Sequence, residues 1–253
     1  MKHLYLLPLA AMICACTGQQ ADNDEQVELN WGTAKLSIEN PIAPGEKVCY
    51  QIKIELDTLA GENALTRQLA SVLRDSVLNA SGRETIQAAM VAFADSMEAE
   101  WKAELAETYD VESEYKDMFQ YYYAINGSPV EEEQDSIVSY QTTTDCYLGG
   151  AHGSYVVQYY NFDKASGKLL SIKDIVPADK EKAVLKAMAE QLCEDWEAKD
   201  LADLQEKTGI TMLGDLYLTD NFLFKGDSIL FLFNQYEIAP YAAGLISVTV
   251  EKP

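Results

Sequence analysis

The stretch Tyr147-Leu148-Gly149-Gly150-Ala151-His152-Gly153 organises the sequence on both sides of it. A Thr-rich run, 140–146, leads into this stretch, and an aromatic, β-branched run, 155–162, follows it. Runs of this kind favour β-strands. Glycine permits backbone angles closed to other residues and lets another chain or a ligand approach closely. We therefore expect two strands joined by a glycine-rich connection that carries His152.

Before this stretch, the period of the apolar residues changes twice. Alternation predicts strands over 27–38 and 48–56, and it returns over 118–125. Between these segments, apolar residues spaced three and four apart predict helices over 62–80 and 84–108. The tetrapeptide Asn126-Gly127-Ser128-Pro129 predicts a turn after the third strand.

After the stretch, a helical period is followed by strands again. We expect strands over 137–147, 154–162, 168–171, 221–224, 229–233 and 245–250, and helices over 179–198 and 200–207. The tripeptide Lys225-Gly226-Asp227 predicts a tight hairpin. Strands and helices in groups, without regular βαβ alternation, indicate the α+β class. We expect an antiparallel sheet with helices packed on it, in a single compact unit of two fused subdomains, 27–135 and 136–253.

The N-terminus has the features of an export signal. Lys2 is followed by an apolar stretch, 4–13, that is too short to span a bilayer. The sequence Ile13-Cys14-Ala15-Cys16 resembles a bacterial lipobox, with the small Ala15 before Cys16. We expect a lipoprotein signal peptide over 1–15, lipidation of Cys16 and a flexible tether over 16–26. An ordinary secretory signal is the alternative.

These features predict a lipid-anchored protein of the bacterial cell envelope, held to the membrane by its lipid alone. The outer membrane, a periplasm-facing position and the cell surface all stay open. The net charge of −22 excludes nucleic acid as the expected partner, because nucleic-acid binding needs a basic surface. The same charge would speed capture of a basic partner, although solubility alone also explains it.

Three cysteines remain after the predicted lipidation site, namely Cys49, Cys146 and Cys193. A disulfide between Cys49 and Cys146 is one expectation if their strands are neighbours, and three small buried apolar side chains are the other. The spacing matches no zinc motif. We expect no metal and no cofactor, because His152 is the only histidine of the mature chain and common metal-dependent hydrolases need more.

An enzymatic role for His152 would need a nucleophile and a carboxylate beside it. Ser154 and Asp145 are close in sequence, but no Gly-x-Ser-x-Gly motif occurs. A structural histidine that holds its loop by hydrogen bonds is the favoured interpretation. A cell-wall hydrolase or esterase that uses His152 remains the alternative.

The segment 236–244 has the composition of a contact loop, because Tyr236, Pro240 and Tyr241 offer rigid aromatic area on a constrained backbone. The alternative is that both tyrosine rings pack on the sheet.

The motifs in this order resemble a known family. The glycine-rich stretch is followed by Tyr160-Asn161-Phe162-Asp163, Gly167-Lys168 and Asp174-Ile175, and later by a run over 231–244. This order resembles the RsiV-like domain family, which also occurs at the N-terminus of the peptidoglycan deacetylase PdaC. The resemblance is most specific over 140–253 and implies helices packed on an antiparallel sheet.

The resemblance also implies a function. In this family an exported anti-sigma factor domain binds lysozyme, and in the deacetylase a separate domain does the chemistry. The expected protein is therefore a non-catalytic, membrane-anchored binding lipoprotein that engages a lysozyme-like muramidase or peptidoglycan. Its expected contact residues lie in two loops that flank the final strands of one sheet: Gly149, Gly150, His152, Tyr236, Pro240 and Tyr241.

Overall fold

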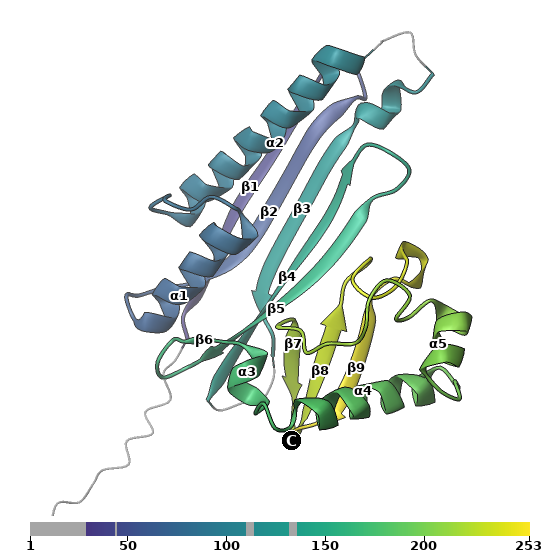
Figure 1. Ribbon diagram of the computed structural model, residues 1–253. Coiled ribbons are helices and arrows are strands. Elements are labelled where there is room, and N and C mark those ends of the chain that lie inside the picture. Colours follow the sequence, from purple (N-terminus) through teal and green to yellow (C-terminus); the bar gives the residue numbers. More distant parts are fainter. Residues whose placement is uncertain (1–28, 44, 110–113, 132–135) are drawn as a thin grey trace, which may run out of the picture.

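The computed structural model describes residues 29–43, 45–109, 114–131 and 136–253 (Figure 1). The expected signal peptide over 1–15, the lipidation site Cys16 and the tether over 16–26 lie outside these residues. Within the described ranges, none of the helices combines the length and the apolar character needed to cross a membrane.

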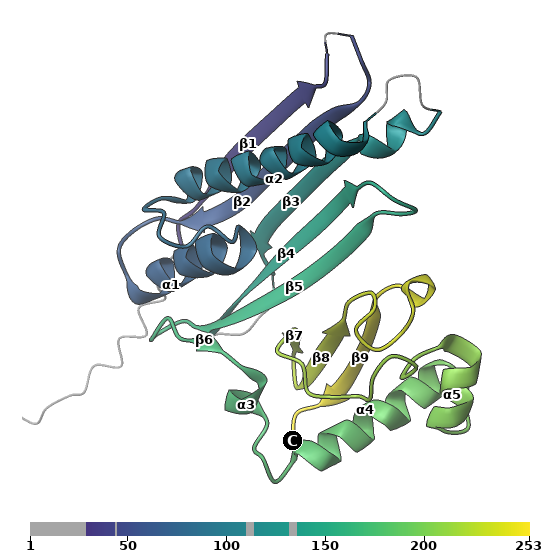
Figure 2. The same ribbon diagram turned by 45° about the horizontal axis from the view of Figure 1, so that its top comes forward.

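A six-stranded sheet takes up the first two thirds of the chain, in the order β1-β2-β3-β4-β5-β6 (Figures 1 and 2). Its strands are β1 Trp31–Pro41, β2 Cys49–Leu59, β3 Tyr121–Pro129, β4 Ile137–Leu148, β5 Ser154–Asp163 and β6 Leu169–Leu170. The pair β2–β3 is parallel, so the expected fully antiparallel sheet is wrong in this one pairing. The reason is the long helical connection between the two strands, because parallel neighbours need such a crossover.

The predicted turn at 126–129 is also wrong, because these residues form the end of β3. Gly127 pairs with Leu56 on one side and with Thr142 on the other. A Cβ atom at Gly127 would lie 2.6 Å from the Tyr140 hydroxyl and 2.7 Å from Leu56 Cδ2. Glycine here marks a close approach within the sheet and not a chain reversal.

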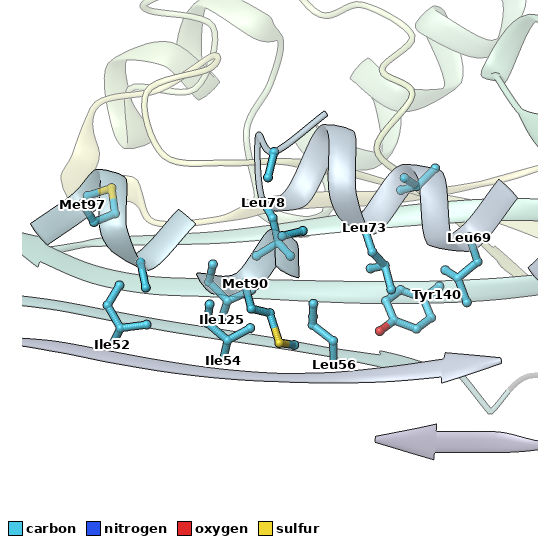
Figure 3. Close-up of a cluster of buried hydrophobic side chains, with 14 of the residues drawn as sticks. Ile52, Ile54, Leu56, Leu69, Leu73, Leu78, Met90, Met97, Ile125 and Tyr140 are labelled. Atoms are coloured by element: carbon cyan, nitrogen blue, oxygen red, sulfur yellow. The ribbon is translucent and has the colours of Figure 1, made fainter. Parts of the chain in front are cut away.

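Two helices cover one face of this sheet and close the first hydrophobic core. Helix α1, Ala64–Val72, continues into the π-helical turn η1, Leu73–Val77, and α2 spans Ile86–Thr108. Figure 3 shows side chains of these helical segments above those of the strands. The strand side chains Tyr50, Ile52, Ile54 and Leu56 are fully buried there. Asn63 and Thr85 begin the two helices by accepting hydrogen bonds from Thr66 N–H and Ala88 N–H.

A separate three-stranded antiparallel sheet, β7-β8-β9, carries the second core. Its elements are β7 Phe222–Lys225, β8 Ser228–Phe233 and β9 Ile246–Glu251, preceded by α3 Ile172–Ile175, α4 Glu181–Asp195 and α5 Leu201–Thr208. The buried face of α4 packs on this sheet (Figure 1). Lys225 pairs with Ser228, which confirms the predicted tight hairpin. The described residues therefore form two sheets, where we expected one.

The division between 135 and 136 stays a prediction. Strands β4 and β5 follow this position in the sequence, yet β4 pairs along β3, which precedes it. The six-stranded sheet thus takes strands from both expected subdomains.

Side-chain amides join the two sheets along the outer edge of β5. The short β6 pairs with Asn161 and Phe162, and among the described residues no strand continues this pairing toward Tyr155. Asn234, Asn221 and Gln235 fill this role. Their side chains accept hydrogen bonds from the backbone N–H groups of Val157, Tyr159 and Tyr155, at 2.8, 2.9 and 3.3 Å in that order. In return, Asn161 Nδ2 donates to the Phe222 carbonyl of β7 at 2.8 Å.

The three cysteines of the folded part are free thiols. Cys49 lies in β2 and Cys146 in β4, and β3 runs between these strands. The condition for the expected Cys49–Cys146 disulfide, neighbouring strands, is therefore not met. Burial raises the pKa of both thiols, which makes them poor nucleophiles.

Candidate aromatic binding site

The two loops singled out in the sequence meet in space. The ring of His152 stacks on that of Tyr241, with centroids 3.8 Å apart and planes 20° apart. Tyr236 completes the group, because its hydroxyl oxygen lies 3.3 Å from His152 Nε2 and its ring is 5.7 Å from that of Tyr241. We call His152, Tyr236 and Tyr241 the aromatic cluster.

The loop that carries His152 is shaped by its glycines. Gly149 and Gly150 have φ angles of 83° and 87°, which glycine adopts easily. A Cβ atom at Gly149 would lie 2.9 Å from the Met118 carbonyl oxygen, and the Tyr147 hydroxyl donates to the Gly150 carbonyl at 2.8 Å. Both glycines therefore shape the backbone of the loop that carries His152. Neither of them is part of the aromatic cluster.

The loop that carries the tyrosines is under backbone strain at Tyr236. Its φ angle is 69°, in the left-handed region that a bulky residue rarely adopts. A backbone hydrogen bond from Glu237 N–H to the Asn234 carbonyl, 3.2 Å long, closes this turn. The Tyr236 side chain is 55% exposed. Strain of this kind concentrates at functional sites.

Pro240 begins the short helical turn η3, Tyr241–Ala243, that presents the second tyrosine. A Cβ atom at Gly209 would lie 3.0 Å from Pro240 Cδ, so Pro240 packs against the end of α5. The expectation that both loops flank one sheet is wrong: the His152 loop joins β4 to β5, whereas the tyrosine loop joins β8 to β9 of the smaller sheet.

Both ring nitrogens of His152 have a hydrogen-bond partner. Nδ1 lies 3.0 Å from the Gly153 carbonyl oxygen, which can only accept, so Nδ1 carries the proton. Nε2 forms the second hydrogen bond, with the Tyr236 hydroxyl. Both ring nitrogens are engaged, and the ring face is covered by Tyr241.

The carboxylate nearest in sequence has another partner. Asp145 accepts a hydrogen bond of 2.8 Å from the Tyr122 hydroxyl. This hydrogen bond, together with burial, raises the pKa of Tyr122 to about 12. The Ser154–His152–Asp145 arrangement considered above is therefore not assembled, because a catalytic triad needs its carboxylate on the histidine ring. Among the described residues, no group of three His, Cys, Asp or Glu side chains could hold a metal ion.

The arrangement offers stacked aromatic faces, two exposed rings and phenolic hydroxyls, which suit binding by stacking and hydrogen bonds. The sequence analysis did not include Tyr122 and Tyr147 in the candidate site. Both lie near the His152 loop, where they bond to Asp145 and to the Gly150 carbonyl. The signal was available in principle, because Tyr122 and Tyr147 are direct cross-strand partners and Asp145 lies two residues along β4 on the same face.

This α+β fold, a mixed sheet beside a smaller antiparallel one, is shared by solved structures. A DUF3298 family member from Bacteroides fragilis superimposes with a TM-score of 0.76 at 21% identity, over 88% of this chain and 90% of that one. A DUF3298 family protein from Pseudomonas aeruginosa gives 0.60 at 16% identity, over 89% and 92%. No curated protein matches the chain in sequence.

Residues 173–252 match the model of DUF3298, a protein family of unknown function. Over this segment the chain is therefore similar to the DUF3298 family. The match lies within 140–253, where the RsiV-like resemblance is most specific, and confirms that resemblance at the level of the domain family.

Proposed function

We propose that this protein is a non-catalytic binding lipoprotein of the bacterial envelope whose aromatic cluster engages a basic, lysozyme-like muramidase. The observation that carries the proposal is the stack of His152 on Tyr241 with Tyr236 beside it, built from two loops of different sheets. Rigid aromatic side chains in constrained loops are the groups that dominate protein interfaces. The RsiV-like resemblance supplies the class of partner.

The charge of the chain supports a basic partner independently. The net charge is −22, and the segments that build the site region, 117–163 and 226–251, contain no Lys or Arg. An acidic surface speeds association with a cationic protein and weakens as salt screens it. Muramidases of the lysozyme type are basic, so their approach would be favoured.

Titration of the purified folded part against lysozyme, at low and moderate salt, tests the proposal. We expect binding whose on-rate falls with salt, and Tyr241→Ala should mainly raise the off-rate. Cytochrome c serves as a basic protein without muramidase structure, and Val91→Ala on α2 serves as a surface control. Absence of lysozyme binding at both salt concentrations, or binding equal to that of cytochrome c, would reject the muramidase.

Two further experiments separate the alternatives. Co-sedimentation with purified peptidoglycan tests cell-wall material as the ligand. Turnover of peptidoglycan or acetyl esters, abolished by His152→Ala in a folded protein, would establish the hydrolase or esterase alternative instead. The lipid anchor has its own test: Cys16→Ala should release the protein from the membrane fraction, and unchanged fractionation would exclude lipidation at Cys16.

A further inference from the structure

A second group of exposed apolar side chains lies next to the aromatic cluster. The loop between α5 and β7, residues 209–221, runs along the tyrosine loop. Leu213 N–H donates to the Ile238 carbonyl at 3.3 Å, and the Tyr217 hydroxyl donates to the Glu237 carboxylate at 3.4 Å. Glu237 directly follows Tyr236, so this loop lies beside the segment that carries the tyrosines of the aromatic cluster. We call Met212, Leu213 and Tyr217 the apolar ridge.

The side chains of the ridge are largely exposed to solvent, so most of their apolar surface does not stabilise the fold. The exposed fractions are 63% for Met212, 52% for Leu213 and 44% for Tyr217. Isolated apolar side chains on a surface need no explanation, but a contiguous group indicates an interaction site. Here the group borders the loop that carries Tyr236 and Tyr241.

The backbone that presents the ridge is held from several sides. Gln205 Nε2 donates to the Thr211 carbonyl at 2.8 Å, and Thr211 has a φ angle of 66°. The ring of Tyr217 packs edge-on against Phe233 of β8, with centroids 5.2 Å apart. A preformed surface loses little conformational entropy on binding, which favours affinity.

The charges around the ridge select the partner. Asp215 and Glu237 are exposed within it, and the segment 208–224 contains no Lys or Arg. On the neighbouring helices, Lys186 is ion-paired with Glu190 and Lys207 with Asp203. The exposed carboxylates of Asp215 and Glu237 therefore favour a cationic protein over an anionic one. A second copy of this chain, itself at −22, would be repelled.

We propose that the apolar ridge and the aromatic cluster together form one docking surface for a cationic protein, in which Met212 and Leu213 supply the apolar anchor. This inference deepens the proposed function and rests on it for the class of partner. Apolar anchors act mainly on the off-rate, whereas the surrounding carboxylates act on the on-rate and its salt dependence.

The test uses the double variant Met212→Ser/Leu213→Ser with two probes, lysozyme and a short amphipathic peptide of lysine and leucine. We expect Kd to rise about tenfold for both probes. The slope of log Kd against log salt should stay unchanged, because no charge is altered. Val91→Ser, an exposed apolar position on α2, is the matched control and should leave Kd unchanged. If the double variant fails to fold, Met212→Ser alone answers the same question.

The outcomes separate the two proposals. Binding by the wild-type protein that is indifferent to the ridge variant overturns the docking surface and leaves the aromatic cluster as the proposed site. Failure of the wild-type protein to bind either probe overturns both. Self-association that the ridge variant abolishes would make a second copy the occupant and would likewise overturn the inference.

Discussion

The side chain of Asn234 substitutes for a β-strand at Val157: it accepts the Val157 N–H at 2.8 Å and donates to the Val157 carbonyl at 3.1 Å. Asn221 extends the same edge, because it also donates to the Val157 carbonyl and accepts from Tyr159 N–H. An open strand edge invites unwanted pairing, and these amides close it. Asn234 also lies two residues before Tyr236. Its hydrogen bonds to β5 therefore help to position the loop that carries the tyrosines of the aromatic cluster.

Asn234→Ala should therefore destabilise the protein by about 1–3 kcal/mol, because it leaves the buried Val157 N–H without a partner. Chemical denaturation measures the change. Asn126→Ala, at an exposed position of β3, is the matched control and should change stability little. Equal effects of the two substitutions would show that the amide joint contributes nothing.

Gly127→Ala should cost about 1–3 kcal/mol through overpacking, because its Cβ atom would meet the buried Tyr140 hydroxyl and Leu56. The Tyr140 hydroxyl cannot easily retreat, since it donates to the Asp57 carbonyl at 2.8 Å. Gly32→Ala in β1 has open space around its Cβ and should be close to neutral. Thermal unfolding of both variants checks the difference, and a tolerated Gly127→Ala would contradict the close approach.

Tyr236→Gly should raise stability by about 1 kcal/mol while it weakens binding, because glycine accepts a left-handed φ without strain. The reverse change, Gly149→Ala, forces a Cβ onto a left-handed backbone 2.9 Å from a carbonyl oxygen and should destabilise. Unfolding curves and a lysozyme titration of the same samples separate the two effects. A Tyr236→Gly variant that loses stability would mean that the ring supports the fold.

Asp174 should stabilise the protein at neutral pH and lose that effect in acid. Hydrogen bonds from Lys168 and from the backbone and side chain of Ser171 lower the pKa of Asp174 from 3.8 to about 2. A carboxyl group whose pKa is lower in the folded state stabilises the protein at any pH above its pKa in the unfolded state. This stabilisation is lost as the pH falls to the pKa of the folded state. The difference between wild type and Asp174→Asn should thus be largest above pH 4 and should vanish near pH 2.

Denaturation midpoints measured from pH 7 to pH 2 follow this difference. Asp179→Asn, an exposed carboxylate before α4, is the control. If the wild-type protein and Asp174→Asn differ by the same amount at pH 7 and pH 2, the hydrogen bonds to Asp174 do not explain its contribution.

The sequence by itself determined the elements whose residues show a clear local period or a strong turn signal. The alternation of β2 and the apolar stripe of α2 are confirmed within a few residues, because each period follows from the face that the element buries. The β7–β8 hairpin is also confirmed, because the preference of its two-residue turn, Gly226-Asp227, is local and does not depend on distant residues. The two loops chosen as candidate contact segments carried glycine, proline and aromatic residues that are visible without any structure.

The tertiary structure alone decided which elements became neighbours. The parallel β2–β3 pair, the separate β7–β9 sheet and the extension of β3 through Gly127 all depend on contacts between residues far apart in the chain. The stack of His152 on Tyr241 joins positions on different sheets, and the buried amides along β5 hold those sheets together. Local periodicity records which face of each element is buried, but it contains no information about the partner that buries it.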